Sequence, residues 1–186
     1  MTQQTASPAA SAAEVVAFWR QAGRQNWFRK SDTFDREVRE RLLPLHEAAK
    51  RGELQGWHST AEGTLALLIL LDQFPRNAFR ASPRMYETDA QARQIAAAAI
   101  DAGFDMQTEV DLRAFFYLPF SHSEALADQQ RAVALQQPMG QDWLYHAKDH
   151  LAIVARFGRF PHRNAILGRE TTPEEQAFLD EGGFAG

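Results

Sequence analysis

The sequence predicts a single all-α domain of about seven to nine helices. No segment combines a period-2 alternation with enrichment in β-branched residues, so no sheet is expected. Several apolar stretches of roughly 10–20 residues instead carry helical spacing and lie between capping residues, glycines and prolines. With 186 residues, 45% of them hydrophobic, the chain is long enough for one buried core and short for two. We expect residues 1–10 to be a disordered tail and residues 11–186 to form the domain.

The N-terminal half contains three predicted helices. Ser11–Glu14 has the spacing of a capping box and begins a helix that ends at Gly23. A second helix is expected from about Asp32 to Arg51, kinked or divided at Pro44. Ser59–Glu62 has the same capping spacing and begins a central helix. Residues 65–71 of that helix are apolar without a break, which predicts burial on most sides.

The C-terminal half contains five further helical segments. Ser82 before Pro83, or Thr88, could start a helix that runs through residues 92–102, and Thr108 starts a short aromatic helix that Pro119 should stop. The next helix is expected to begin with the capping box of Ser121–Glu124 and to end before Pro138. Residues 142–157 form another, and Thr172 caps a short terminal helix.

Composition excludes several classes of protein. The absence of cysteine excludes disulfides, thiolate zinc sites and a thiol nucleophile, and is compatible with a reducing compartment. A net charge of −4 disfavours a general nucleic-acid binder. The N-terminus lacks the pattern of a secretory signal, and the apolar run at residues 65–71 is far shorter than the ~20 residues that span a bilayer. We therefore expect a soluble cytoplasmic protein that binds neither nucleic acid nor membrane.

One short pattern occurs twice. Phe74-Pro-Arg-Asn77 reappears as Phe160-Pro-His-Arg-Asn164, each time at the predicted end of an apolar helix. Residues 73–86 contain three arginines and no acid, and residues 156–169 contain four arginines and no acid. We predict that these segments form two loops on the same side of the domain, close enough for Arg76 and Arg163 to contact one ligand or one carboxylate.

The two segments and the residues beside them contain the predicted ligand-binding residues. These are Asp72, Arg76, Asn77, His122, Glu124, Arg159, His162, Arg163 and Asn164. Guanidinium groups suit phosphate or carboxylate because they donate two parallel hydrogen bonds. The same arginines could equally bond the exposed carbonyls at helix ends, or pair with buried Asp72 and Glu124. Both interpretations remain open from the sequence.

Histidines provide the candidate acid–base chemistry. If Ser121 caps a helix, His122 falls at its first position, where the helix dipole favours a neutral imidazole that could act as general base. Glu124 would then be the return arm of the capping box. His146 and His150 have metal-ligand spacing, but the zinc-protease motif is absent and His150 lies on an apolar stripe. We expect neither a metal nor a cofactor.

Three stretches together resemble a known family: LALLILLDQFPRNAFR, FFYLPFSHSEALADQ and ARFGRFPHRNAILGRETTPEE. With Val16–Trp19 and the Trp27–Phe28 pair, they are similar to the bacterial domain-of-unknown-function family 924, over residues 14–179. The resemblance implies a tetratricopeptide-like α/α superhelix. It implies no activity.

The leading functional hypothesis is a helical protein that binds a small anionic molecule or an acidic peptide end. One alternative is a hydrolase or phosphoryl-handling enzyme that uses His122 in the same pocket. Another is a protein-interaction scaffold whose polar motifs are purely structural. Whether the chain is an enzyme, and its oligomeric state, are left open by the sequence.

Overall fold

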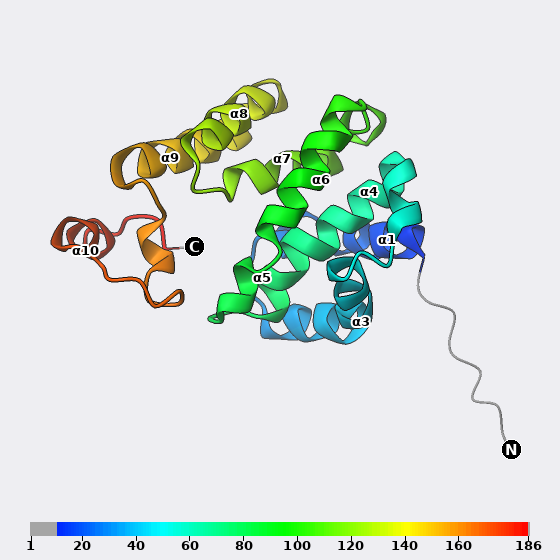
Figure 1. Cartoon of the computed structure of the whole chain (residues 1–186), viewed down its shortest axis with the longest axis horizontal. Helices are drawn as coiled ribbons and strands as arrows, with labels where there is room; N and C mark the ends of the chain where they lie inside the picture. Colours follow the sequence, from blue (N-terminus) through cyan, green and yellow to red (C-terminus); the bar gives the residue numbers. More distant parts are fainter. Residues whose placement is uncertain (1–10, 186) are drawn as a thin grey trace, which may run out of the picture.

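The structure is a computed structural model that describes residues 11–185, and every regular element in that range is helical (Figure 1). The expected tail at residues 1–10 lies outside the described residues. In chain order the α-helices are α1 (Ala12–Ala22), α2 (Arg24–Trp27), α3 (Asp32–Lys50), α4 (Ala61–Leu68), α5 (Phe74–Ala78), α6 (Asp89–Asp101), α7 (Val110–Ser121), α8 (Leu126–Gln136), α9 (Gln141–Phe157) and α10 (Pro173–Asp180). Five short 3₁₀ turns accompany them: η1 (Gln55–Ser59), η3 (Pro83–Tyr86), η4 (Asp105–Gln107), η5 (Gln137–Met139) and η6 (Pro161–Arg163).

A π-helical turn, η2 (Ile69–Gln73), joins α4 to α5 without a break. Because α4, η2 and α5 form one continuous rod, the ten α-helices amount to nine rods within residues 11–185, as the all-α prediction expected. Residues of this rod are almost inaccessible: Leu68 is 0% exposed, and Leu67 and Leu71 are also buried. The unbroken apolar run therefore forms the centre of the core, which confirms its predicted burial.

The rod packs against helices from both halves of the chain. α1 and α3 lie against it on one side, and α6 and α7 on another. In Figure 1 the chain proceeds from the blue helices on the right, through this central rod, to the red α10 on the left. A second, smaller apolar cluster forms around Ile153, Val154 and Phe160, with Phe178 and Phe184 against it. Within residues 11–185, no helix is long and apolar enough to cross a membrane.

Local sequence signals explain some helix ends but not others. The capping boxes of α1 and α10 are present with both reciprocal hydrogen bonds. The central rod, however, is capped by Thr60, whose side chain accepts from the Gly63 N–H, and not by Ser59 as predicted. α3 continues through Pro44 and is not divided there.

The predicted capping box at residues 121–124 is wrong. α7 does not stop at Pro119 but continues to Ser121, and His122 is its C-terminal cap. α8 begins only at Leu126, with Ala125 before it and no side-chain cap. His122 therefore lies at a helix C-terminus and not at a helix N-terminus. Burial of nearly the whole of α7 explains why its helix persists: aromatic packing offsets the hydrogen bond that proline removes.

The first of the two arginine segments also differs from its prediction. Phe74–Ala78 is helical, so Arg76 and Asn77 lie on α5 rather than in a loop. The second segment does leave its helix: α9 ends at Phe157, Gly158 caps it in the left-handed conformation, and a 3₁₀ turn follows Phe160.

Candidate functional site

A cavity of about 550 Å³ lies between the central rod and the C-terminal part of the chain. Its walls come from α2, η2, α5, η3, α7, α8, α9 and η6, with Phe184 near the C-terminus. Five of the nine predicted ligand-binding residues line it: Arg76, Asn77, His122, His162 and Arg163. Asp72 lies directly behind them, bonded to His122. Segments more than 80 residues apart in the sequence thus meet at one cavity, as the repeated pattern predicted.

Arg76 is held by acceptors on three sides. Its Nη1 donates to the Asp72 carbonyl at 2.6 Å and lies 3.2 Å from the Asp72 carboxylate. Both terminal nitrogens also donate to the two oxygens of Asp89, at 2.8 and 2.9 Å. Burial lowers the pKa of this guanidinium, but the two carboxylates raise it more, so its net shift is upward. The structural interpretation therefore holds for Arg76, which pairs with Asp72 and bonds a backbone carbonyl.

Arg163 is in a different situation at the same cavity. It is 7% exposed, and its guanidinium lies between the rings of Tyr86 and Phe160, 4.6 and 4.5 Å from their centroids. The one carboxylate within 4.0 Å of it in the described part of the chain is Asp89, at that limit. Its Nε is buried without a hydrogen-bond partner. Burial, and then the charge of Arg76, hold its pKa below the usual range. Arg163 is a buried cation with very little compensation.

His122 and Asp72 form a hydrogen-bonded pair at the cavity wall. His122 Nδ1 lies 2.8 Å from Asp72 Oδ1, and Gln73 Nε2 donates to the other oxygen at 2.6 Å. Burial raises the pKa of the Asp72 carboxyl, but Arg76 and His122 outweigh it and lower the pKa to about 2. Burial and Arg76 lower the pKa of His122, although Asp72 opposes them. At neutral pH the pair is therefore a carboxylate beside a neutral imidazole.

Three further histidines line the cavity: His146, His150 and His162. Burial lowers the pKa of His150 to about 3, and burial with the neighbouring Arg163 lowers that of His162 to about 4. The Nδ1 atoms of both are buried without a hydrogen-bond partner. His150 thus lies on the apolar stripe of α9 but is not a fully hydrogen-bonded core histidine. Within residues 11–185, no three histidine, aspartate or glutamate side chains are arranged to hold a metal ion.

The remaining three predicted residues are structural. Glu124 accepts from Arg169 at 2.7 and 3.0 Å and from the Phe160 N–H at 2.8 Å, so it ties η6 to the start of α8 rather than closing a capping box. Arg159 donates to Glu175 at 2.6 Å. Asn164 is fully buried between Glu175 and Arg169. None of the three lines the cavity.

Two residues of the site escaped the sequence analysis. Asp89 is shared between Arg76 and Arg163, and Tyr86 lies beneath both guanidinium groups. Asp89 resembles an ordinary first-turn acid of α6, and Tyr86 an ordinary loop aromatic. A signal was present in their position, because both lie within or just after the first arginine-rich segment.

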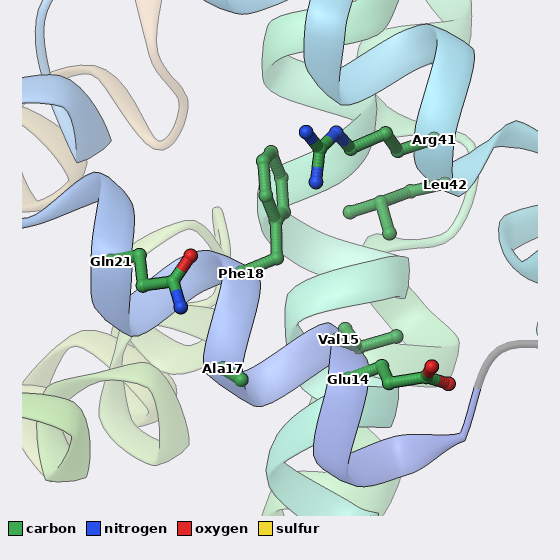
Figure 2. Close-up of a pocket in the computed structure, with 7 residues that line it drawn as sticks. All are labelled: Glu14, Val15, Ala17, Phe18, Gln21, Arg41 and Leu42. Carbon is green, nitrogen blue, oxygen red and sulfur yellow. The ribbon is translucent and has the colours of Figure 1, made fainter.

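Figure 2 shows a second hollow, of about 390 Å³, where α1 faces α3. Arg41 reaches across the ring of Phe18 at 5.0 Å and pairs with Glu37 on its own helix. Its charge is thus compensated and exposed, and no buried ionisable group points into the hollow. The hollow contains none of the predicted site residues and is the weaker candidate.

Comparison with known proteins gives the family. The model of the family described as "Bacterial protein of unknown function (DUF924)" matches residues 15–183. The chain belongs to the DUF924 family. A solved structure, "Structure of Protein of Unknown Function ATU0120 from Agrobacterium tumefaciens", is similar, with a TM-score of 0.90 and 56% identity over 92% of this chain and 97% of that one. None of the curated proteins matches. The resemblance inferred from the three sequence stretches is thereby confirmed at the level of the family.

Proposed function

We propose that this DUF924 protein binds a small organic carboxylate, either a free acid or the acidic end of a short peptide, in the cavity around Arg163. The single observation that supports this most is the buried guanidinium of Arg163, which has no hydrogen-bond acceptor at its Nε and only one distant carboxylate. An uncompensated buried cation is costly to a fold, and an anionic ligand would remove that cost.

The charges around the cavity favour a singly charged ligand. Asp72 and Asp89 together compensate Arg76, and Asp35 compensates Arg80 with contacts of 2.5 and 3.1 Å. Arg24 also lines the cavity, but it is exposed and lies 3.7 Å from Asp142. Arg163 is the buried arginine of the wall without a close carboxylate. His150 and His162 are neutral at pH 7 because burial lowers the pKa of both, so they offer hydrogen bonds rather than charge. A carboxylate suits one guanidinium better than a phosphate dianion does.

The rest of the wall favours a ligand with an apolar body. Trp27, Phe28, Leu118, Trp143 and Phe184 all line the cavity. A volume of about 550 Å³ is within the usual range for a small-molecule site, roughly 300–1,000 Å³. Aromatic walls with a few polar groups are the common composition of such sites.

Phenylacetate, compared with the uncharged phenylacetamide, provides a direct test. Phenylacetate should raise the melting temperature and follow a stabilisation of RT ln(1 + [L]/Kd), whereas the amide should not. Acetyl-phenylalanine and its amide make the same comparison for the acidic end of a peptide. Chloride at equal ionic strength controls for screening.

Arg163→Gln should abolish the shift, whereas the matched change Arg156→Gln should preserve it, because Arg156 is exposed and pairs with Glu174 on the surface. Equal shifts with acid and amide, or an Arg163→Gln protein that responds like the wild type, would overturn the proposal. In that case the scaffold hypothesis would be favoured.

Two broader features belong to the same proposal. Consecutive helices pack in pairs along α6, α7, α8 and α9 (Figure 1), which supports a tetratricopeptide-like arrangement of this part. The lack of cysteine supports a location in a reducing compartment such as the cytoplasm.

A further inference from the structure

We propose that Asp72 and His122 form a catalytic dyad, in which His122 Nε2 is the general base that activates water for hydrolysis of an ester in a carboxylate-bearing substrate. The inference rests on the proposed function for one point: Arg163 would hold the carboxylate of the substrate. The hydrogen bonds of Asp72 and His122 support the dyad independently of Arg163.

The hydrogen bond to Asp72 selects the useful tautomer of His122. Asp72 is ionised, so it can only accept, and His122 Nδ1 must therefore carry the proton it donates across 2.8 Å. This leaves the lone pair on Nε2. His122 lines the cavity with its side chain 15% exposed, and Nε2 is not among the buried atoms without partners. A basic nitrogen is thus available to the cavity, in the orientation that catalytic Asp–His pairs use.

Asp72 is more precisely oriented than an ion pair with Arg76 requires. Asp89 already accepts from both terminal nitrogens of Arg76. Asp72 nevertheless has both oxygens occupied, one by His122 and Arg76 and the other by Gln73. A carboxylate fixed in this way holds the imidazole ring in one orientation and would stabilise the imidazolium that forms when Nε2 takes a proton.

The backbone around the dyad is irregular on both sides. Asp72 and Gln73 lie in the π-helical turn η2, and π-turns within α-helices occur frequently at functional sites. His122 follows the helix that runs through Pro119 and forms its C-terminal cap. Neither irregularity is needed to bury an apolar rod, so both are better explained by the placement of these two side chains.

The proposed step balances without a further reactant. Nε2 of His122 takes a proton from water as the water oxygen attacks the ester carbonyl carbon and the carbonyl electron pair moves to oxygen. The tetrahedral intermediate then expels the alkoxide or phenoxide, which receives the proton from Nε2, and a carboxylic acid and an alcohol or phenol leave. Water is the nucleophile in this proposal because the chain has no cysteine and the hydroxyl of Ser121 accepts from Gln136 at 2.7 Å.

Two chromogenic esters test the dyad on the full chain: 4-nitrophenyl hydrogen succinate, which carries a carboxylate, and 4-nitrophenyl acetate, which does not. We expect faster release of nitrophenol from the succinate ester, with kcat/KM rising with pH and reaching a plateau above the pKa of His122. The groups facing His122 are Asp72, Arg76, Asp89 and His150. The pKa of Asp72 is lowered to about 2 and that of His150 to about 3, so neither should contribute to the rise of kcat/KM near neutrality.

Variants separate the roles. His122→Gln should lower kcat by about 10²-fold or more, within the range that a general base contributes, while His58→Gln, on exposed η1, should leave it unchanged. Asp72→Asn should lower kcat and move the rise of kcat/KM to lower pH, because Asp72 raises the pKa of His122; a merely structural role would not move this profile. ¹⁵N NMR of the histidines should show loss of the Nδ1–H form of His122.

The outcomes of the esterase and binding experiments are distinguishable. If Arg163→Gln leaves both esters equally hydrolysed and His122 is still required, the carboxylate site is wrong and the dyad stands. If phenylacetate binds through Arg163 but His122→Gln hydrolyses the succinate ester as fast as the wild type, the dyad is overturned. Nitrophenol release no faster than in buffer overturns it as well.

Discussion

At the scale of single residues, the two matching arginines have opposite relations to the fold. Arg76 has acceptors for its donors and two carboxylates beside it. Arg163 occupies the equivalent place in the second pattern, but its partner Asp89 is engaged with Arg76 and lies 4.0 Å away. The arginine of the first copy, Arg76, thus stabilises the fold through ion pairs. The arginine of the second copy, Arg163, is a buried charge without a close carboxylate.

This difference predicts opposite effects on stability. Arg163→Met should raise the free energy of unfolding by about 1 kcal/mol, because desolvation of the cation is removed and the apolar stem is retained. Asp72→Asn should lower it by about 3 kcal/mol, because Arg76 and His122 lose a buried partner. Urea unfolding of both variants measures the two changes. A fall with Arg163→Met would show that the guanidinium is structural.

At the scale of elements, local patterns predicted helices well where the signal and its partner lie within one turn. The capping boxes of α1 and α10 need only residues three apart, and both are present. The apolar run of the central rod needs only its own composition. The same capping-box spacing at residues 121–124 predicted the wrong start for α8, because Glu124 bonds Arg169, 45 residues away. No local pattern contains that contact, so the position of His122 could not be derived from it.

Two adjacent residues could have capped the N-terminus of the central rod. Ser59 and Thr60 are adjacent hydroxyl residues, and either could precede the helix. Thr60 accepts from the Gly63 N–H, whereas the Ser59 hydroxyl donates to the Gly56 carbonyl. Thr60→Ala should therefore lower the free energy of unfolding by about 1 kcal/mol, and Ser59→Ala by much less. Thermal unfolding of the pair compares them directly, and equal losses would contradict the assignment of the cap.

At the scale of the whole molecule, the cavity lies where the main core meets the small apolar cluster of the C-terminal part. The repeated pattern predicted this meeting, because it marked two distant segments with the same chemistry. The sequence could not predict which residue near the C-terminus completes the cavity wall. Phe184 reaches His150 and His162, with ring centroids 4.7 and 5.1 Å apart, near the very end of the described chain. Outside the cavity, Glu124 holds the C-terminal part to the start of α8 by accepting from Arg169 and from the Phe160 N–H.

A ligand that bridges Arg163 and the central rod should therefore order the C-terminal part. Phenylacetate is expected to slow amide hydrogen exchange in residues 158–185 more than in α3, because binding adds contacts across the cavity.

Phe184→Ala should weaken binding several-fold while changing the melting temperature of the empty protein little, since Phe184 is only partly buried. The control is Phe28→Ala, because Phe28 also lines the cavity, is 53% exposed and belongs to the first half of the chain. It should weaken binding without altering exchange in residues 158–185 of the empty protein. Protection spread evenly over the whole chain would show that the ligand stabilises the fold globally and does not act at this junction.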